Sequence, residues 1–180
     1  MSNISPEFAL LGFLLAEPSH GYDLHQKFQN ELGNVWRLSQ SEAYAILKRL
    51  EARGDISAQL VAQDKLPSRQ IFHITESGKH RFGEWLHNAG HNARAIRLEF
   101  LTRLYFTQQY DPGHTARVYA VQKAEIQANI ERLESMLSHL PPGQTYNRLS
   151  LDLRLRQLRL IQDWMREIKA QFDLPEEDEA

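Results

Sequence analysis

Apolar residues recur at helical spacing along most of the chain and alternate with polar residues in only one stretch. In the N-terminal part the spacing predicts three helices, at about residues 6–17, 20–32 and 39–53. The first is apolar nearly all round, which is typical of a helix at the centre of a core. Ser19 is expected to cap the second. Three short helices therefore precede residue 54.

The third predicted helix has its own start and stop signals and two unlike faces. Ser39 and Glu42 have the spacing of a capping box, and Gly54 is expected to supply a left-handed stop. The positions expected to face a core are Ala43, Ile46, Leu47 and Leu50. The positions left to face outward are Gln40, Ser41, Ala45, Lys48, Arg49 and Ala52. Small and amide side chains together with cations suit a helix that enters a major groove, but an ordinary amphipathic helix has the same pattern.

After Gly54 the period of the apolar positions changes from 3.6 to 2. Residues 56–60 and 71–74 alternate, and residues 64–68 form a turn between them, which predicts a β-hairpin. A fourth helix is expected to open at Thr75. Three helices followed by a hairpin is the order of a winged helix-turn-helix domain.

The second half of the chain reads as all helical. Helices are predicted over residues 114–140 and 146–172, separated by Pro-Pro-Gly. The stripe expected to be buried on the last helix is Leu149, Leu153, Leu160, Trp164 and Ile168. Two such long helices cannot bury both stripes in so small a unit, which indicates a homodimer. The fold class is thus mainly α. A winged helix-turn-helix domain at 1–88 precedes an antiparallel helical dimerisation domain at 92–174 and an acidic tail at 175–180.

Composition narrows the possible functions. The 180 residues include no cysteine, so disulfides, thiolate metal sites and cysteine nucleophiles are excluded. We find no apolar run long enough for a membrane span, no phosphate loop and no catalytic constellation. The sequence therefore predicts a cytoplasmic protein that is not an enzyme and needs no cofactor or metal.

The net charge of −2 argues against a general attraction to nucleic acid. Residues 1–87 hold nine Lys and Arg against ten Asp and Glu, and the remainder of the 21 and 23 in the chain are twelve and thirteen. A surface for DNA must therefore be local. Lys65 and Arg69, at the tip and shoulder of the predicted wing, could contact phosphates or the minor groove, although basic residues in a turn often serve solubility alone.

Several motifs stand at fixed separations along the N-terminal half. They are His20-Gly21-Tyr22, then Tyr44 with Leu47, Leu50, Glu51 and Gly54, then Thr75-Glu76-Ser77-Gly78. Together they resemble the PadR family of transcriptional regulators. The helical second half is similar to the longer C-terminal domain of one branch of that family. The resemblance implies a homodimeric regulator, usually a repressor, that binds an inverted-repeat operator in double-stranded DNA and in many members is released by a small aromatic compound.

The resemblance also implies roles for single residues. Candidate DNA contacts are Ser39, Gln40, Ser41, Tyr44, Lys48, Arg49, Lys65 and Arg69. For Tyr44, contact with a phosphate and packing at the helix edge are both open, whereas Gly21 and Tyr22 are assigned to packing. The aromatic residues that could line an effector pocket, or simply form a core, are Trp85, Phe100, Tyr105 and Phe106. The alternative function is a winged-helix module that binds another protein.

Overall fold

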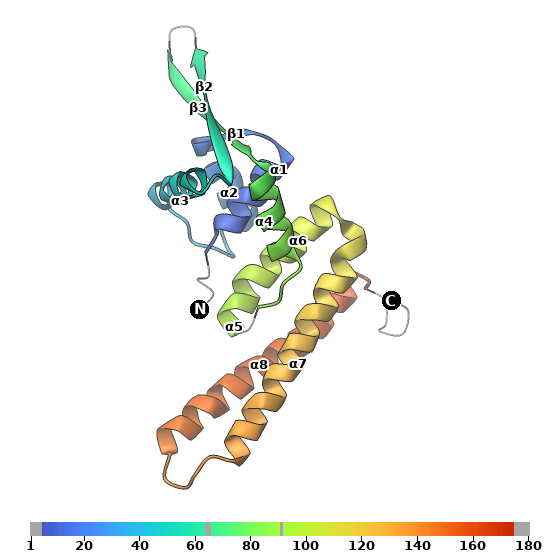
Figure 1. The fold of residues 1–180 in the computed structure, drawn as a ribbon. Coiled ribbons are helices and arrows are strands. Elements are labelled where there is room, and N and C mark those ends of the chain that lie inside the picture. Colours follow the sequence, from blue (N-terminus) through green and yellow to red (C-terminus); the bar gives the residue numbers. More distant parts are fainter. Residues whose placement is uncertain (1–4, 64–65, 91, 175–180) are drawn as a thin grey trace. The chain divides into compact units, whose positions relative to one another are not determined.

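The chain is mainly helical and divides into two compact units, Met1–Leu86 and His87–Ala180. The computed structural model describes residues 5–63, 66–90 and 92–174 (Figure 1). The acidic tail expected at residues 175–180 lies outside the described residues. Each unit has a core of its own and is described by itself.

The N-terminal unit is a winged helix-turn-helix domain, as its sequence pattern predicts. Its elements, in order, are α1 (Glu7–Ala16), β1 (Ser19–His20), α2 (Gly21–Leu32), α3 (Gln40–Ala52), β2 (Ile56–Gln63), β3 (Leu66–Ile74) and α4 (Glu76–Leu86). The strands form an antiparallel sheet in the order β1-β3-β2. Helix α1 packs against α2, α3, α4 and β3, which explains why it is apolar nearly all round.

The start of α2 differs from the prediction. Ser19 was expected to cap it, but Ser19 pairs with Phe72 in the short strand β1, and the N-cap is His20. The Tyr22 backbone amide donates to the His20 Nδ1 atom over 3.2 Å. The expectation failed because pairing with β3 is a long-range contact that holds Ser19 in extended conformation.

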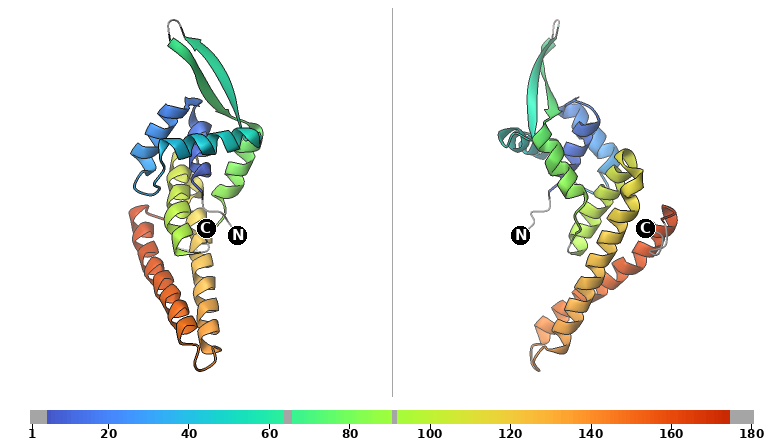
Figure 2. Two further views of the ribbon diagram at one scale, coloured as in Figure 1. Left: turned by 90° about the vertical axis from the view of Figure 1, so that its left-hand side faces the viewer. Right: turned by 45° about the vertical axis from the view of Figure 1, so that its right-hand side comes forward.

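The wing alternates as predicted only near its base. Ile56 lies opposite Ile74 and is buried, whereas Leu60, on the same face of β2, is 74% exposed. The outer half of the hairpin projects beyond the helices of its unit (Figure 2), in keeping with the exposure of Leu60. A period of 2 gives the face of a strand but not how far along the strand that face is covered.

Asp55 stands immediately before the wing and is 1% exposed. Its Oδ2 atom accepts from Arg53 Nε at 3.1 Å and from Arg81. The Nη2 atoms of both arginines lie 3.1 Å from the Glu7 carboxylate. This network, called here the Asp55 ion cluster, joins α1, the end of α3 and α4, and compensates the burial of a carboxylate.

The C-terminal unit is built on two long helices that lie side by side, α7 (Thr115–Ser138) and α8 (Thr145–Gln171) (Figures 1 and 2). Before them the chain forms α5 (Ala93–Ala95), a π-helical turn η1 (Ile96–Phe100), α6 (Leu101–Tyr110) and the short turn η2 (Pro112–His114). Their shared core contains Phe100, Leu104, Val118, Ile126 and Leu155.

The predicted buried stripe of α8 is confirmed at Ile168 and is wrong at its three leucines. The buried residues of α8 are Leu151, Leu155, Leu158, Met165 and Ile168. Of the predicted stripe, Leu149, Leu153 and Leu160 are 60%, 57% and 71% exposed. Helix α8 therefore carries two apolar stripes, and the sequence pattern does not show which of them faces α7.

Candidate nucleic-acid interface

Helix α3 has the capping and the two faces that its sequence predicts. The Glu42 amide donates to Ser39 Oγ over 3.3 Å, and the Ser39 amide donates to Glu42 Oε2 over 2.9 Å, which closes the capping box. The Ser39 hydroxyl and the Ser39 backbone amide both donate to the Glu42 carboxylate, which holds the pKa of that carboxyl below its usual value. At the other end Gly54 has φ +78°, the left-handed conformation expected of a helix stop.

The exposure of the α3 side chains separates a core face from an outer face. All four apolar residues predicted to face the core are buried. All six predicted outward residues are exposed, namely Gln40, Ser41, Ala45, Lys48, Arg49 and Ala52. The outer face offers an amide and a hydroxyl, two alanines that allow close approach, and two cations, with no carboxylate among the six.

Two candidate residues at the helix start are already engaged within the protein. The Ser39 hydroxyl donates to Glu42 Oε2 over 2.6 Å and lies 3.2 Å from Ser41 Oγ. Ser39 therefore has a local capping role whether or not it also approaches DNA. Ser41 remains exposed at the first turn, where backbone N–H groups favour an anion.

Arg37 was not among the predicted site residues. It is exposed between the buried Trp36 and Leu38, and it lines a groove of about 300 Å³ together with Glu42 and Arg49. A cation between two buried residues just before an N-cap is the signal that could have identified it. The groove places two guanidinium groups along one edge of α3.

Tyr44 lies at the other edge of α3, against the start of α2. It is 37% exposed, and its ring lies so close to Gly21 that a Cβ at position 21 would be 2.7 Å from its Cε1 atom. Tyr22 is 48% exposed, so packing covers only about half of its side chain, whereas Gly21 is buried as expected. Two tyrosines are thus exposed where α2 meets α3.

The wing residues are only partly described. Lys65 lies outside the described residues. The backbone of Arg69 lies in β3 opposite Val61. Two further arginines of the domain, Arg53 and Arg81, belong to the Asp55 ion cluster, so their charge is matched by carboxylates within the protein.

The four aromatic residues proposed to line an effector pocket lie in two units. Trp85 is in the N-terminal unit, where it stacks on Phe8 with ring centroids 5.0 Å apart. In the C-terminal unit Phe100 and Phe106 are fully buried, and Tyr105 packs edge-on against Phe106. The structure therefore brings Tyr105 and Phe106 together, within a packed core.

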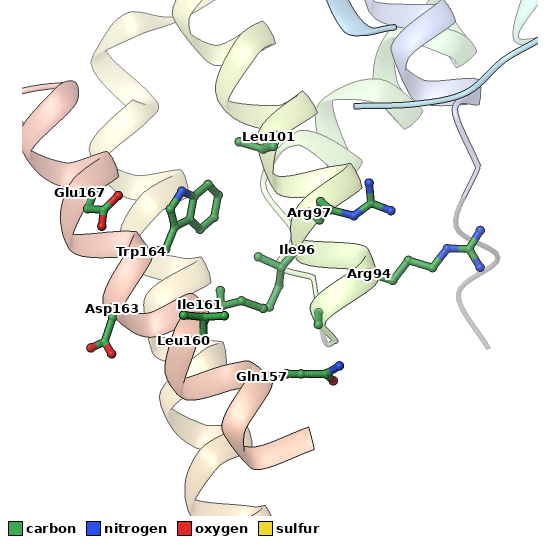
Figure 3. A pocket seen from close by; sticks show the side chains of 11 residues that line it. Arg94, Ile96, Arg97, Leu101, Gln157, Leu160, Ile161, Asp163, Trp164 and Glu167 are labelled. Carbon is green, nitrogen blue, oxygen red and sulfur yellow. The ribbon is translucent and has the colours of Figure 1, made fainter. Parts of the chain in front are cut away.

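A large groove occurs elsewhere in the C-terminal unit, between α8 and the segment from α5 to α6. Its volume is about 730 Å³. Figure 3 shows Ile96 and Ile161 pointing toward each other across it, and Trp164 between the helices. Arg94 and Arg97 belong to one wall, and Asp163 and Glu167 to the other.

Among the described residues, no three His, Asp or Glu side chains gather to hold a metal ion. None of the described helices is long and apolar enough to cross a membrane.

Comparison with known proteins finds a matching family and several similar proteins. Residues 10–84 match the family described as "Transcriptional regulator PadR-like family". The "Negative transcriptional regulator PadR" of Bacillus subtilis (strain 168) is 26% identical over 134 residues, which are 74% of each chain. The crystal structure of Bacillus subtilis PadR in complex with operator DNA is 24% identical, with a TM-score of 0.47, covering 92% of this chain and 98% of that chain. The structure of that protein in complex with p-coumaric acid is 23% identical, with a TM-score of 0.42, covering 94% and 96%.

The matched segment runs from α1 to α4 and contains the whole of α3 and the wing. The helical unit that follows is an extension beyond it. The N-terminal unit therefore belongs to the PadR-like family of transcriptional regulators, which are DNA-binding proteins and not enzymes.

Proposed function

We propose that this regulator is a homodimeric repressor that places two copies of α3 in successive major grooves of an inverted-repeat operator. The observation that carries the proposal is the outer face of α3, where two cations, an amide and a hydroxyl are exposed while the opposite stripe is buried. Repression is supported by the relative named as a negative regulator.

Each exposed residue of α3 has a role that its chemistry suits. Gln40 and Ser41 would read base edges, since an amide can pair with adenine and a hydroxyl with several bases. Lys48 and Arg49 would contact phosphates or guanine, and Arg37 would add a phosphate contact from beside Arg49. The remaining proposed contacts are Ser39 and Tyr44 at the edges of α3 and Lys65 and Arg69 on the wing.

The outer stripe of α8 supports a dimer. Tyr146, Leu149, Leu153 and Leu160 are 57% to 87% exposed, at spacings of three, four and seven residues. The stripe continues into the groove of Figure 3, which Leu160 and Trp164 line. The groove has arginines on one wall and carboxylates on the other, so a two-fold axis would bring opposite charges together. Two α3 helices about 34 Å apart would then meet successive major grooves.

We propose a small aromatic acid as the effector. A crystal structure of Bacillus subtilis PadR contains p-coumaric acid, and the proposal extends that ligand class to this chain on family membership. Such a compound can release DNA only if it binds more tightly to the dimer form whose α3 spacing does not fit the operator. Titration of p-coumaric acid into the protein–DNA complex tests this proposal. If the same volume of buffer without p-coumaric acid releases as much DNA, the proposal is contradicted.

The test of DNA binding is an electrophoretic shift with the DNA upstream of the gene for this chain, at two salt concentrations. The double variant Lys48→Ala/Arg49→Ala should bind at least about tenfold more weakly and show a shallower salt dependence, because each phosphate contact contributes about 0.9 to the slope. The matched control is Lys27→Ala/Lys79→Ala, which removes the same charge from side chains paired with Glu17 and Glu76.

The alternative is a winged-helix module that binds another protein. It is favoured if the Lys48/Arg49 variant and the Lys27/Lys79 control both keep the DNA affinity of the wild type. Equal losses in both variants would show that only net charge matters, which would contradict the assignment of α3 as the reading helix.

A further inference from the structure

Gly21 is the first residue of α2, and its backbone does not explain why it is glycine. The described glycines with positive φ are Gly54 and Gly143, so Gly21 does not need the left-handed region. Alanine is more favourable than glycine in helices by up to about 1 kcal/mol. The space around Gly21 must therefore be the reason.

That space is filled by Tyr44. A Cβ on Gly21 would lie 2.7 Å from Cε1, 2.9 Å from Cζ and 3.0 Å from the hydroxyl oxygen of Tyr44. All three atoms belong to the far end of one side chain, which can swing away. By contrast, a Cβ on Gly83, in α4, would meet no atom within 4 Å.

The hydroxyl held in this way is free to contact a ligand. Tyr44 is 37% exposed, and its hydroxyl has no hydrogen-bond partner among the residues that the structure describes. Tyr44 stands four residues after Gln40 and four before Lys48, so the three side chains lie along one side of α3. The hydroxyl end of the ring lies beside Gly21, at the edge of the α3 surface proposed for DNA.

We infer that Gly21 is a positioning residue for DNA binding: its missing side chain lets the Tyr44 ring rest on α2, which fixes the Tyr44 hydroxyl where it can donate to a backbone phosphate. The inference rests on the DNA-binding role proposed for α3. Phosphate contacts fix the register of a protein on the duplex without reading sequence, so an ordered hydroxyl at the edge of the recognition helix suits that task.

The inference predicts different effects on thermal stability and on affinity for DNA, which a purely structural role of Gly21 would lower together. Gly21→Ala moves only the end of a side chain, so thermal stability should stay nearly unchanged. Affinity for DNA should fall about tenfold, close to the effect of Tyr44→Phe, because one hydrogen bond to a charged group is lost. Gly83→Ala, inside α4, is the matched control: it should leave the affinity for DNA unchanged, while thermal stability stays the same or rises.

A double-mutant cycle provides the test, with the full chain and a generic duplex at low salt, since a phosphate contact does not depend on sequence. In the Tyr44→Ala background, Gly21→Ala should cause no further loss of affinity. An equal loss with and without Tyr44, or no loss with Tyr44 present, overturns the inference. If Gly21→Ala fails to fold, Tyr44→Ala must restore folding, and failure to do so also overturns it.

The Lys48→Ala/Arg49→Ala variant, measured on the same duplex, distinguishes this inference from the proposed function. If that variant loses affinity and Gly21→Ala does not, the positioning role alone is wrong. If neither variant loses affinity, the DNA-binding role of α3 is wrong as well.

Discussion

The two units of the chain bury their apolar residues to different extents. In the N-terminal unit the helix stripes are buried, and the outward face of α3 is polar apart from small alanines. In the C-terminal unit α8 buries one apolar stripe on α7 and leaves a second one exposed, with Tyr146 at 87% and Leu160 at 71%. The first unit completes its own core, whereas the second has apolar surface left over for a partner.

The largest effect is expected from breaking the exposed stripe of α8. Leu153→Glu/Leu160→Glu places two carboxylates on the proposed dimer face, so the protein should become monomeric and bind an inverted repeat about a hundredfold more weakly or worse, because bivalent binding is lost. Sedimentation and DNA titration measure the two effects. Ala170→Glu, at an exposed position of α8 outside the stripe, is the control. A double variant that remains dimeric would contradict the proposed interface.

A smaller effect is expected from the Asp55 ion cluster, which stabilises the N-terminal unit. Arg81→Met leaves the buried Asp55 with Arg53 alone, and the free energy of unfolding should fall by about 2 kcal/mol, allowing for the partial exposure of Arg81. Chemical denaturation measures this change. Lys79→Met, which breaks the exposed pair with Glu76, should stay within about 0.5 kcal/mol. Equal effects of the two substitutions would show that the cluster has no special role.

Removal of the α3 cap should cost less. Ser39→Ala deletes the acceptor for the Glu42 amide, and the N-terminal unit should lose about 1 kcal/mol of stability. Ser41→Ala, two residues on, is the control and should be nearly neutral. A loss from Ser41→Ala as large as that from Ser39→Ala would contradict the capping role.

The smallest effect concerns pH. The folded-state pKa of Glu42 lies below its usual value of 4.5, because Ser39 hydrogen-bonds to the carboxylate. A lowered folded pKa contributes stability above the unfolded value and loses it as the pH falls through the folded pKa. Glu42→Gln should therefore narrow its stability difference from the wild type as the pH is lowered from 6 toward 3, as measured by thermal unfolding. A difference that widens toward low pH would have the wrong sign.

Local signals were sufficient for α3 and insufficient for α2 and α8. The capping box of Ser39 and Glu42, the stop at Gly54 and both faces of α3 follow from neighbouring residues, and the structure agrees with all of them. The cap of α2 and the buried stripe of α8 depend on β3 and α7, which are distant in sequence. The same limit applies to the candidate site: the exposure of Lys48 and Arg49 follows from the helical period, whereas the exposure of Arg37 and Tyr22 does not.

The sequence by itself determined the order of helices and strands, the two faces of α3 and the family, because spacing, caps and motifs are properties of neighbouring residues. Only the tertiary structure decided that Asp55 is neutralised by Arg53 and Arg81, that Gly21 makes room for Tyr44, and that Leu149, Leu153 and Leu160 stay exposed. Each of these three features depends on which residues from distant parts of the sequence come into contact in the folded chain. Periodicity identifies an apolar face, but only packing selects the surface that covers it.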